Sequence, residues 1–325
     1  MIGKFKTVTT PLLSAMLLIA ITGAAALVQG NPYDTAPTWS RDGQFIYFYT
    51  YRHGNAELYR MTPDGENQTR ITESDYSNWW TASLSDPDKL IVVSDRDSGR
   101  LFGGSNLFLL DIKTGDFDNL TNVATGRWAA APSVATEKNI VLYAESEKFG
   151  MDMPRELKLL DLNTQEITSY PDDPRHNNLH PAVSADGTVV SYARRSDSGV
   201  TIYLNDLTGQ HERPFLDVQG DPPLTSLSAN GDWIVFTLGM SARTLGEDGK
   251  MIAEREVLLA RTDGTVLRRL TVSASSDHGA VFSPDGKTIT FASYRHGPSE
   301  IFAIDVEGNH ERNITRTSVE ETGEH

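Results

Sequence analysis

The segment Pro37-Thr38-Trp39-Ser40-Arg41-Asp42-Gly43 decides the fold, because a similar segment returns near the end of the chain as Ala280-Val281-Phe282-Ser283-Pro284-Asp285-Gly286. Each ends in an Asp-Gly pair, which supplies the positive-φ residue that a tight hairpin turn needs. An apolar run follows, and then a second turn at Gly65 or Gly308. The equivalent first-turn segments between them are 82–88, 132–138, 181–187 and 225–231. Six copies of one unit therefore tile the chain from about residue 36 to 315. Internal repeats of this length indicate solenoids, propellers or arrays.

The connections between the turns differ in how much their lengths vary. From the second turn of one unit to the first turn of the next, the distances are 23, 23, 22, 22 and 22 residues. Within the units they are 22, 27, 27, 22, 33 and 22 residues, so units two, three and five carry insertions at roughly 95–106, 145–156 and 238–256. Binding groups usually lie on variable loops that a fixed scaffold positions. We therefore expect function on the face that bears the insertions.

Each unit contains the signals of four β-strands. In the first unit, 45–49 is a run of β-branched and aromatic residues, 57–61 alternates polar with apolar residues, and 68–72 follows the second turn. With 38–40 as the first strand, these segments predict an antiparallel meander. Six meanders that cannot bury both faces alone predict an all-β fold, a six-bladed β-propeller of four-stranded antiparallel blades. The predicted blades are about 36–72, 73–121, 122–170, 171–216, 217–271 and 272–315.

The repeat resembles that of the TolB-type β-propeller family. The shared pattern is a proline or aromatic residue, Ser-Pro-Asp-Gly, an apolar strand, Ser-x-Arg-x-Gly, Glu-Ile-Phe and a closing Leu/Ile-Thr. It is clearest at 37–72 and 280–315, with 181–213 next. The resemblance implies the propeller repeats, without the additional N-terminal domain of TolB itself, because only about 35 residues precede the first unit. Similar propellers also precede peptidase domains with a Gly-x-Ser-x-Gly elbow, and no such motif follows here.

The first thirty residues have the pattern of a secretory signal peptide. Lys4 and Lys6 precede an apolar stretch from Leu12 to Val28, in which 24–26 are three alanines. We therefore expect a signal peptide at 1–30 and a single propeller domain at 31–325. An uncleaved membrane anchor remains the alternative. Export predicts a periplasmic or secreted protein, and the absence of cysteine excludes disulfides and thiolate chemistry.

The charge of the chain limits its partners. Acidic residues number 44 and basic residues 29, a net charge of -15, and loss of the two signal-peptide lysines makes it -17. Such a field repels phosphates and anionic lipids, so we expect neither nucleic acid nor a membrane surface as a partner.

Aromatic, histidine, arginine and aspartate side chains occur in the connections that topology places on the insertion-bearing face. Rings stack on sugars or peptides, and charged groups form strong hydrogen bonds. The candidate ligand-binding residues are Trp79, Trp80, Trp128, His180, His278, Asp277, Arg52, His53, Arg295 and His296. A structural role is the alternative for the arginines, because Arg96 and Arg194 recur in equivalent loops and residues that recur normally brace the repeat.

A metal site is a further possibility. His53, His180, His278 and His296 converge on one axis if the propeller loops all point inward, and histidines with carboxylates hold divalent ions. Oligogalacturonate lyases, which have a related propeller, use a metal near the axis. No His-x-His spacing supports such a site here. We expect no cofactor, with a divalent cation as the open alternative, and we identify no catalytic residue.

Three functions remain open from the sequence. The first is a non-enzymatic scaffold in the cell envelope that binds a protein, peptide or glycan on the loop-rich face. The second is a metal-assisted polysaccharide lyase or hydrolase with an axial site. The third is a structural module that completes an envelope complex.

Overall fold

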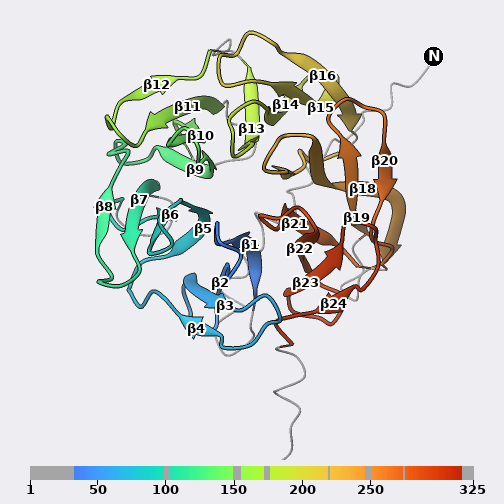
Figure 1. Ribbon diagram of the computed structural model, residues 1–325, viewed down its shortest axis with the longest axis horizontal. Coiled ribbons are helices and arrows are strands. Elements are labelled where there is room, and N and C mark those ends of the chain that lie inside the picture. Colours follow the sequence, from blue (N-terminus) through green and yellow to red (C-terminus); the bar gives the residue numbers. More distant parts are fainter. Residues whose placement is uncertain are drawn as a thin grey trace, which may run out of the picture.

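The computed structural model describes residues 33–98, 103–148, 155–171, 176–218, 220–245, 251–273 and 275–316. These residues form 24 strands in six sheets, and each sheet consists of four consecutive antiparallel strands. Figure 1 shows the sheets arranged radially about a central axis. The predicted six-bladed all-β propeller is confirmed. The predicted signal peptide lies outside the described residues, and no helix in the described part of the chain is long and apolar enough to cross a membrane.

The blades follow chain order, and the first strand of each blade lies nearest the axis (Figure 1). Blade one comprises β1 (Thr35–Trp39), β2 (Ile46–Thr50), β3 (Glu57–Met61) and β4 (Thr69–Arg70). Blade two comprises β5 (Asn78–Ser83), β6 (Lys89–Ser94), β7 (Asn106–Asp111) and β8 (Phe117–Asn119). Blade three comprises β9 (Trp128–Ala135), β10 (Ile140–Ser146), β11 (Arg155–Asp161) and β12 (Ile167–Ser169).

Blade four comprises β13 (Asn177–Val183), β14 (Val190–Ser196), β15 (Gly199–Asn205) and β16 (Arg213–Val218). Blade five comprises β17 (Thr225–Leu227), β18 (Trp233–Leu245), β19 (Met251–Arg261) and β20 (Leu267–Arg269). Blade six comprises β21 (Asp277–Phe282), β22 (Thr288–Ser293), β23 (Glu300–Asp305) and β24 (Arg312–Asn313). The insertion of blade five lengthens β18 and β19 into a long hairpin.

The core consists of apolar clusters between neighbouring blades, one at each of the six interfaces. The second strands of the blades show why the core lies between the blades. Ile46 of β2 packs in the cluster shared with blade six, while its neighbour Tyr47 packs in the cluster shared with blade two. Successive side chains of a strand point to opposite faces, so a strand buried on both faces needs a continuous apolar run rather than an alternating one. The run Ile46-Tyr47-Phe48 satisfies this requirement, with each residue at most 1% exposed.

The first turn of the repeat is held by its serine and aspartate. Ser40 Oγ donates to Asp42 Oδ1 at 2.6 Å, and Asp42 Oδ1 accepts the N–H of Gln44 at 3.0 Å. Ser40 Oγ also accepts the N–H of Phe45 at 2.9 Å. These hydrogen bonds lower the pKa of Asp42, and Gly43 supplies the φ of 71° that the turn needs. The serine of blades four and six makes the same contacts.

The closing threonine of the repeat connects the outer two strands. In blade one, Thr72 Oγ1 accepts the N–H of Leu58 at 2.9 Å and donates to the buried carboxylate of Glu57. Thr271 makes the same pair of contacts in blade five, to the Val257 N–H and to Glu256. A buried carboxylate is stable only when its oxygens are hydrogen-bonded, and this threonine provides one of those bonds. The glutamate of the Glu-Ile-Phe signal and the threonine of the closing Leu/Ile-Thr signal are therefore hydrogen-bonded to each other in these blades.

The ring closes without exchange of a strand among the described residues, since the first and last sheets each contain only their own consecutive strands. The Asp34 N–H donates to the Ser299 carbonyl and Ser299 Oγ donates to the Asp34 carbonyl, both at 2.8 Å. Trp39 Nε1 donates to Thr290 Oγ1 at 3.0 Å across the same seam. Backbone and side-chain hydrogen bonds and an apolar cluster therefore close the ring.

We predict that Thr72→Val destabilises the propeller by about 1–3 kcal/mol, because it leaves the buried Leu58 N–H without its partner and removes one of the two hydrogen bonds to Glu57 Oε2. Thr69→Val in the same strand is the matched control, because Thr69 is exposed and should change stability by less than about 0.5 kcal/mol. Urea unfolding followed by tryptophan fluorescence measures both. Equal stability of the two variants would contradict the role assigned to Thr72.

Candidate ligand-binding site

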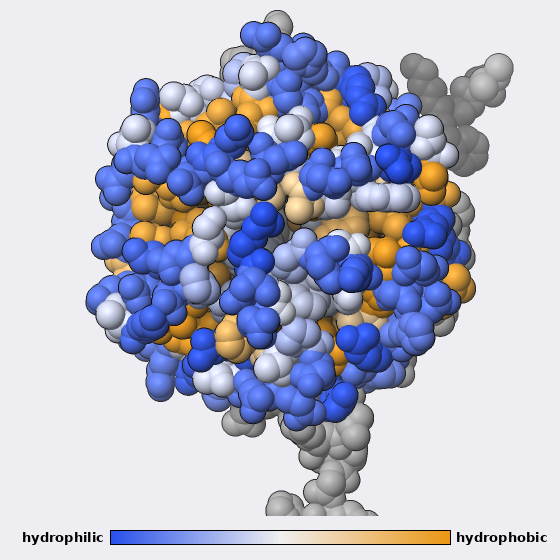
Figure 2. Space-filling model, in the orientation of Figure 1, coloured by the Kyte–Doolittle hydropathy of each residue, from blue (hydrophilic) through white to orange (hydrophobic). Residues whose placement is uncertain are grey.

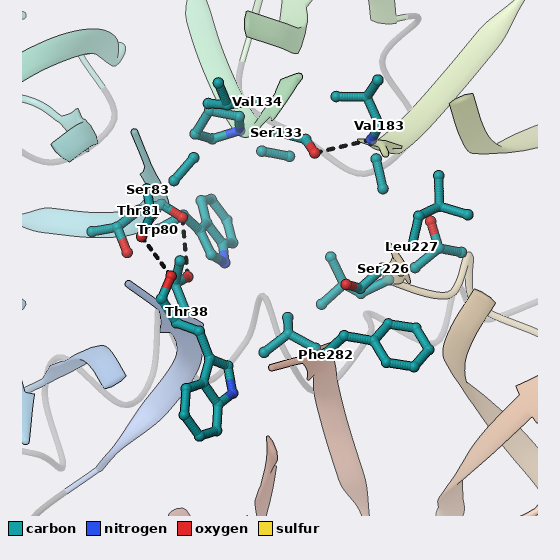
Figure 3. A pocket seen from close by; sticks show the side chains of 18 of the residues that line it. Thr38, Trp80, Thr81, Ser83, Ser133, Val134, Val183, Ser226, Leu227 and Phe282 are labelled. Atoms are coloured by element: carbon teal, nitrogen blue, oxygen red, sulfur yellow. Dashed lines mark hydrogen bonds between the residues drawn. The ribbon is translucent and has the colours of Figure 1, made fainter. Parts of the chain in front are cut away.

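A cavity of about 290 Å³ lies on the axis of the propeller, and we call it the axial cavity. The first strands of all six blades line it, and Figure 3 shows their side chains pointing toward a common space. It extends from the bulge at Ala36 and His180 to the first turns at Arg41 and Pro284. Hydrophilic residues cover most of the face of the ring seen in Figure 2, with apolar residues visible between the blades.

The wall of the axial cavity is mostly small and neutral. Its hydroxyl-bearing residues include Thr38, Thr81, Ser83, Ser133, Thr225 and Ser226. Several of these hydroxyls join neighbouring blades, as Figure 3 shows: Thr38 Oγ1 donates to the Thr81 carbonyl at 3.1 Å and Ser83 Oγ donates to the Trp39 carbonyl at 2.6 Å. Trp80, at 37% exposure, is the large apolar side chain that the wall presents to solvent.

The innermost strands carry β-bulges next to the axis. The register shifts in β1, β9, β13 and β21, and Ala36, Ala131, His180 and Gly279 there have φ values of 50°, 51°, 51° and 62°. A residue other than glycine in this left-handed region costs on the order of 1 kcal/mol. Bulges change the direction of side chains, and the bulge in β13 places His180 in the wall of the axial cavity.

His180 is held neutral. Its Nδ1 lies 3.2 Å from the Pro223 carbonyl, which only accepts, so Nδ1 carries the proton and Nε2 is the basic nitrogen. Burial, aided by the positive charge of Arg155, lowers the pKa of His180 to about 4. The side chain lies deep within the ring yet keeps part of its surface in the cavity. Arg155, at the end of the blade-three insertion, lines the cavity beside it.

His278 is buried behind the cavity wall. Its ring stacks on Tyr294 with the centroids 5.0 Å apart, and its Nε2 lies 3.2 Å from Thr35 Oγ1. Burial, followed by the charge of Arg255, lowers the pKa of His278 to about 3. This histidine therefore belongs to the packing between blades six and one.

Aromatic side chains form a continuous series across blades three, two, one and six, and we call it the aromatic arc. The centroids of Trp128 and Trp79 are 6.3 Å apart, and Trp79 Nε1 donates to Tyr51 Oη at 3.2 Å. Tyr33 then lies 5.9 Å from Tyr51 and 5.8 Å from Tyr294, and the hydroxyls of Tyr33 and Tyr294 are hydrogen-bonded. Trp79 also packs against the apolar cluster between blades two and three. Trp79 and Trp128 are thus brought together, whereas Trp80 faces the axial cavity.

Arg52, Asp277 and Arg295 form contacts within their own blades. Arg52 Nη2 donates to the buried Asp34 at 2.7 Å, and its guanidinium lies 5.1 Å from the centre of the Tyr59 ring. Arg295 Nη2 lies 3.1 Å from both carboxylate oxygens of Asp277. Burial raises the pKa of Asp277, and a hydrogen bond from Ser293 and the charge of Arg295 act against that rise. These contacts brace the loops against buried acids, which is the structural alternative considered for the arginines.

His53 and His296 also bind within their own blades. His53 Nε2 lies 2.7 Å from Tyr59 Oη, and His296 Nδ1 lies 2.9 Å from Glu300 Oε2. The four histidines therefore do not converge on the axis, as they would if all the loops pointed inward. His53 and His296 instead contact side chains of their own third strands. Within the described residues, no group of three or more His, Asp or Glu side chains is placed to hold a metal ion.

The described end of the blade-three insertion reaches the axis, and the described ends of the other two contact the connections between blades. Ser105 pairs with Trp128, and Arg155 lines the axial cavity. Arg255, from blade five, donates to Asp221 at 2.9 Å. Residues 99–102, 149–154 and 246–250 of the insertions lie outside the described residues.

Sequence reasoning missed the cavity hydroxyls, the tyrosines of the arc, and Arg155 and Arg255. The hydroxyls had a signal in the chain, because small polar residues open several units, as in Pro37-Thr38 and Pro132-Ser133. Tyr51 and Tyr294 also had a signal, because each begins a Tyr-Arg-His-Gly copy, whereas the contact of Tyr33 with Tyr294 depends on ring closure.

We predict that His278 makes the propeller less stable in acid. The folded state keeps this ring neutral down to a pKa of about 3, whereas the unfolded chain takes up a proton near pH 6.5. Its contribution to stability is therefore complete above about pH 6.5 and decreases as the pH falls, by about 2 kcal/mol at pH 5. Denaturant unfolding of wild type and His278→Gln between pH 8 and 5 should show a shallower slope in the variant. Identical slopes would contradict this prediction.

Comparison with known proteins agrees with the geometry. Residues 16–169 match the model of the TolB β-propeller domain family. A TolB homologue from Chlorobium luteolum is 28% identical over 132 residues, which are 41% of this chain and 27% of that protein. The chain spans about a quarter of the length of the curated relatives it matches.

Solved structures extend the likeness of fold to the whole ring. TolB from Acinetobacter baumannii has a TM-score of 0.64 at 18% identity, covering 92% of this chain and 67% of that one. An oligogalacturonate lyase in complex with manganese has a TM-score of 0.58 at 17% identity, covering 87% and 76%. The repeat pattern, the six four-stranded blades and the family match agree, and this chain is a six-bladed β-propeller whose repeats are similar to those of the TolB β-propeller family.

Proposed function

We propose that this chain is a non-enzymatic binding scaffold of the cell envelope, which takes a protein, peptide or glycan partner at the axial cavity and the aromatic arc beside it. The observation that carries the proposal is Trp80. It stands 37% exposed in the wall of a cavity whose other residues are mostly small and neutral. An indole ring left partly in water at a concave site is a suitable surface for stacking a sugar ring or a peptide side chain.

The wall around Trp80 supports recognition by neutral hydrogen bonds. Hydroxyls such as those of Ser133 and Ser226 both donate and accept, so they match the hydroxyls of a sugar or the amides of a peptide. Concave sites with a few convergent polar groups are where ligands usually bind. The three insertions would enlarge the contact on the loop-rich face, and Arg155, at the described end of the blade-three insertion, lines the axial cavity.

The envelope location rests on the sequence of residues 1–30 and on the TolB-type propeller. Two lysines followed by a long apolar stretch are typical of an export signal. A chain without cysteine gains no disulfide after export, and its stability comes from the apolar clusters between the blades.

The test is capture of partners from an envelope extract, together with a glycan array, using wild type and Trp80→Ala. We expect the substitution to weaken binding roughly tenfold or more, because the stacking surface is removed. The melting temperature should change little, since surface substitutions usually cost less than about 0.5 kcal/mol. Leu267→Ala is the matched control, because Leu267 is 55% exposed on the outer strand β20. Equal capture by all three proteins would contradict the proposed site.

A chelator separates this proposal from the metal-assisted alternative. Capture by the scaffold should be the same with and without EDTA, because the groups assigned to the site are neutral hydroxyls and an indole. Loss of binding with EDTA, restored by Mn²⁺ or Ca²⁺ and accompanied by cleavage of a polysaccharide, would favour the lyase. No ligand in either screen would favour the structural module.

A further inference from the structure

An arginine near the end of the second strand is clamped on the flank of several blades. In blade four, Arg194 donates to both oxygens of Glu212, at 2.9 and 2.6 Å. In blade six, Arg295 donates to Glu311 at 2.7 Å. In each case the guanidinium also lies over an aromatic ring of the third strand. The Arg194 Cζ atom is 4.3 Å from the centroid of the Tyr203 ring, and the Arg295 Cζ atom is 4.5 Å from that of the Phe302 ring. We call this arrangement, a ring below and a carboxylate beside the guanidinium, the arginine clamp.

The partner acid of the clamp has a fixed place in the repeat. Glu311 stands two residues before Asn313, which pairs with the third-strand ring of Phe302. Glu212 likewise stands two residues before Pro214, which pairs with Tyr203. Blade one has the polar Gln68 at this place, and its Oε1 accepts from Arg52 at 3.0 Å.

Blade two keeps the arginine and the ring but lacks the acid. Asn119 pairs with Phe108, so the partner place two residues earlier is Phe117. In blade six a further acid, Asp277, contacts the arginine and pairs with Ser293, whereas in blade two Asn78 pairs with Ser94. Both groups that neutralise Arg295 are therefore replaced by uncharged residues beside Arg96.

Among the described residues, Arg96 packs against aromatic rings, and the acids whose charges act on it are Asp97, Glu57 and Asp95. Its guanidinium lies 3.4 Å from the centre of the Phe117 ring and 5.7 Å from that of Phe108. Its Nε is buried without a hydrogen-bond partner, and burial lowers the pKa of its guanidinium. Each of these acids accepts a hydrogen bond from another group: Asp95 Oδ1 from the Ser77 N–H at 2.9 Å, Asp97 Oδ2 from Asn119 Nδ2 at 2.7 Å, and Glu57 Oε1 from the Ser74 N–H at 2.8 Å.

The space beside Arg96 is a pocket of about 180 Å³ on the flank between blades one and two, which we call the flank pocket. Residues 71–74 line it from blade one, and Arg96, Gly115 and Phe117 line it from blade two. Glu73 is directed to solvent, with its side chain 86% exposed, and lies 3.6 Å from Arg70. None of the residues lining the axial cavity lines this pocket.

We propose that the flank pocket binds a carboxylate group from outside the chain, with Arg96 making the contact that Arg194 and Arg295 make to glutamates of their own blades. The planar guanidinium matches a carboxylate through two parallel hydrogen bonds. A monovalent carboxylate suits the pocket better than a phosphate dianion, because Glu73 and the net charge of -15 repel a second negative charge. This site goes beyond the proposed function and does not depend on it.

The test follows the side chain of Arg96 directly. The ¹⁵N–¹H resonance of Arg96 Nε, assigned by its absence in Arg96→Gln, is recorded in the purified protein during titration at constant ionic strength. One arm uses sodium acetate, and the other uses acetyl-Gly-Glu-Gly-amide with the neutral acetyl-Gly-Gln-Gly-amide as its control. We expect a saturable shift with both carboxylates and none with the neutral peptide.

Two substitutions at one repeat position make the result specific. Phe117→Glu installs the acid that blades four and six possess, and it should weaken binding of the added carboxylate roughly tenfold by occupying Arg96. Leu267→Glu adds the same charge at the equivalent place in blade five, where the second strand runs on as Thr237-Leu238-Gly239 without an arginine, and it should leave the Arg96 shift unchanged. Arg96→Lys keeps the charge but loses the planar fork, so its affinity should also fall, as measured by calorimetry.

The outcomes decide both the site and the source of its ligand. Tighter binding of the glutamate peptide than of acetate identifies an acidic peptide side chain as the ligand, and equal affinity identifies a small free acid. The proposal is overturned if the Arg96 resonance does not move with either carboxylate, or if it moves equally in Phe117→Glu.

Discussion

Face-to-face packing of the blades is the constraint on which the rest of the structure depends. Each sheet is apolar on both faces, and adjacent residues such as Ile46 and Tyr47 serve two different interfaces. Since no blade buries its faces alone, each blade depends on both of its neighbours, and ring closure covers the outer faces of the first and last blades. Closure here uses the Asp34–Ser299 hydrogen bonds and an apolar cluster rather than a shared strand. With the core placed between the blades, the strands at the axis are free to be small and polar.

Polar side chains that recur in the repeat complete this packing at the edges of each blade. Thr72 with Glu57 and Arg295 with Asp277 satisfy buried groups that would otherwise destabilise the outer strands and the loops. Breaking one partner of such a buried pair costs far more than the pair contributes, so selection for fold alone retains both. Functional residues are therefore best sought where the repeat departs from its own rule, as at Trp80 and Arg96.

The fold was predictable because turn signals and apolar runs are local, and their spacing alone indicates six equal units. Side-chain contacts were less accessible. An axial position for His53 and His296 was one possibility that the sequence left open, yet each contacts a residue of its own third strand, Tyr59 or Glu300. The left-handed conformation of His180, which no glycine signals, directs that side chain into the axial cavity. Contacts across the seam, such as Tyr33 with Tyr294, depend on ring closure and have no trace in local spacing.

The axial cavity and the flank pocket differ in the charge of the groups that line them. At the axis, burial holds His180 and His278 neutral, with pKa values of about 4 and 3, so neither gains charge at any pH near neutrality. Most of the wall around Trp80 consists of neutral hydroxyls and alanines, and a ligand there is selected by shape, stacking and neutral hydrogen bonds. On the flank, Arg96 keeps a full charge among rings, in a protein whose overall field is negative. Only a group that pairs closely with the guanidinium overcomes that field, which restricts the flank pocket to ligands that fit it at short range.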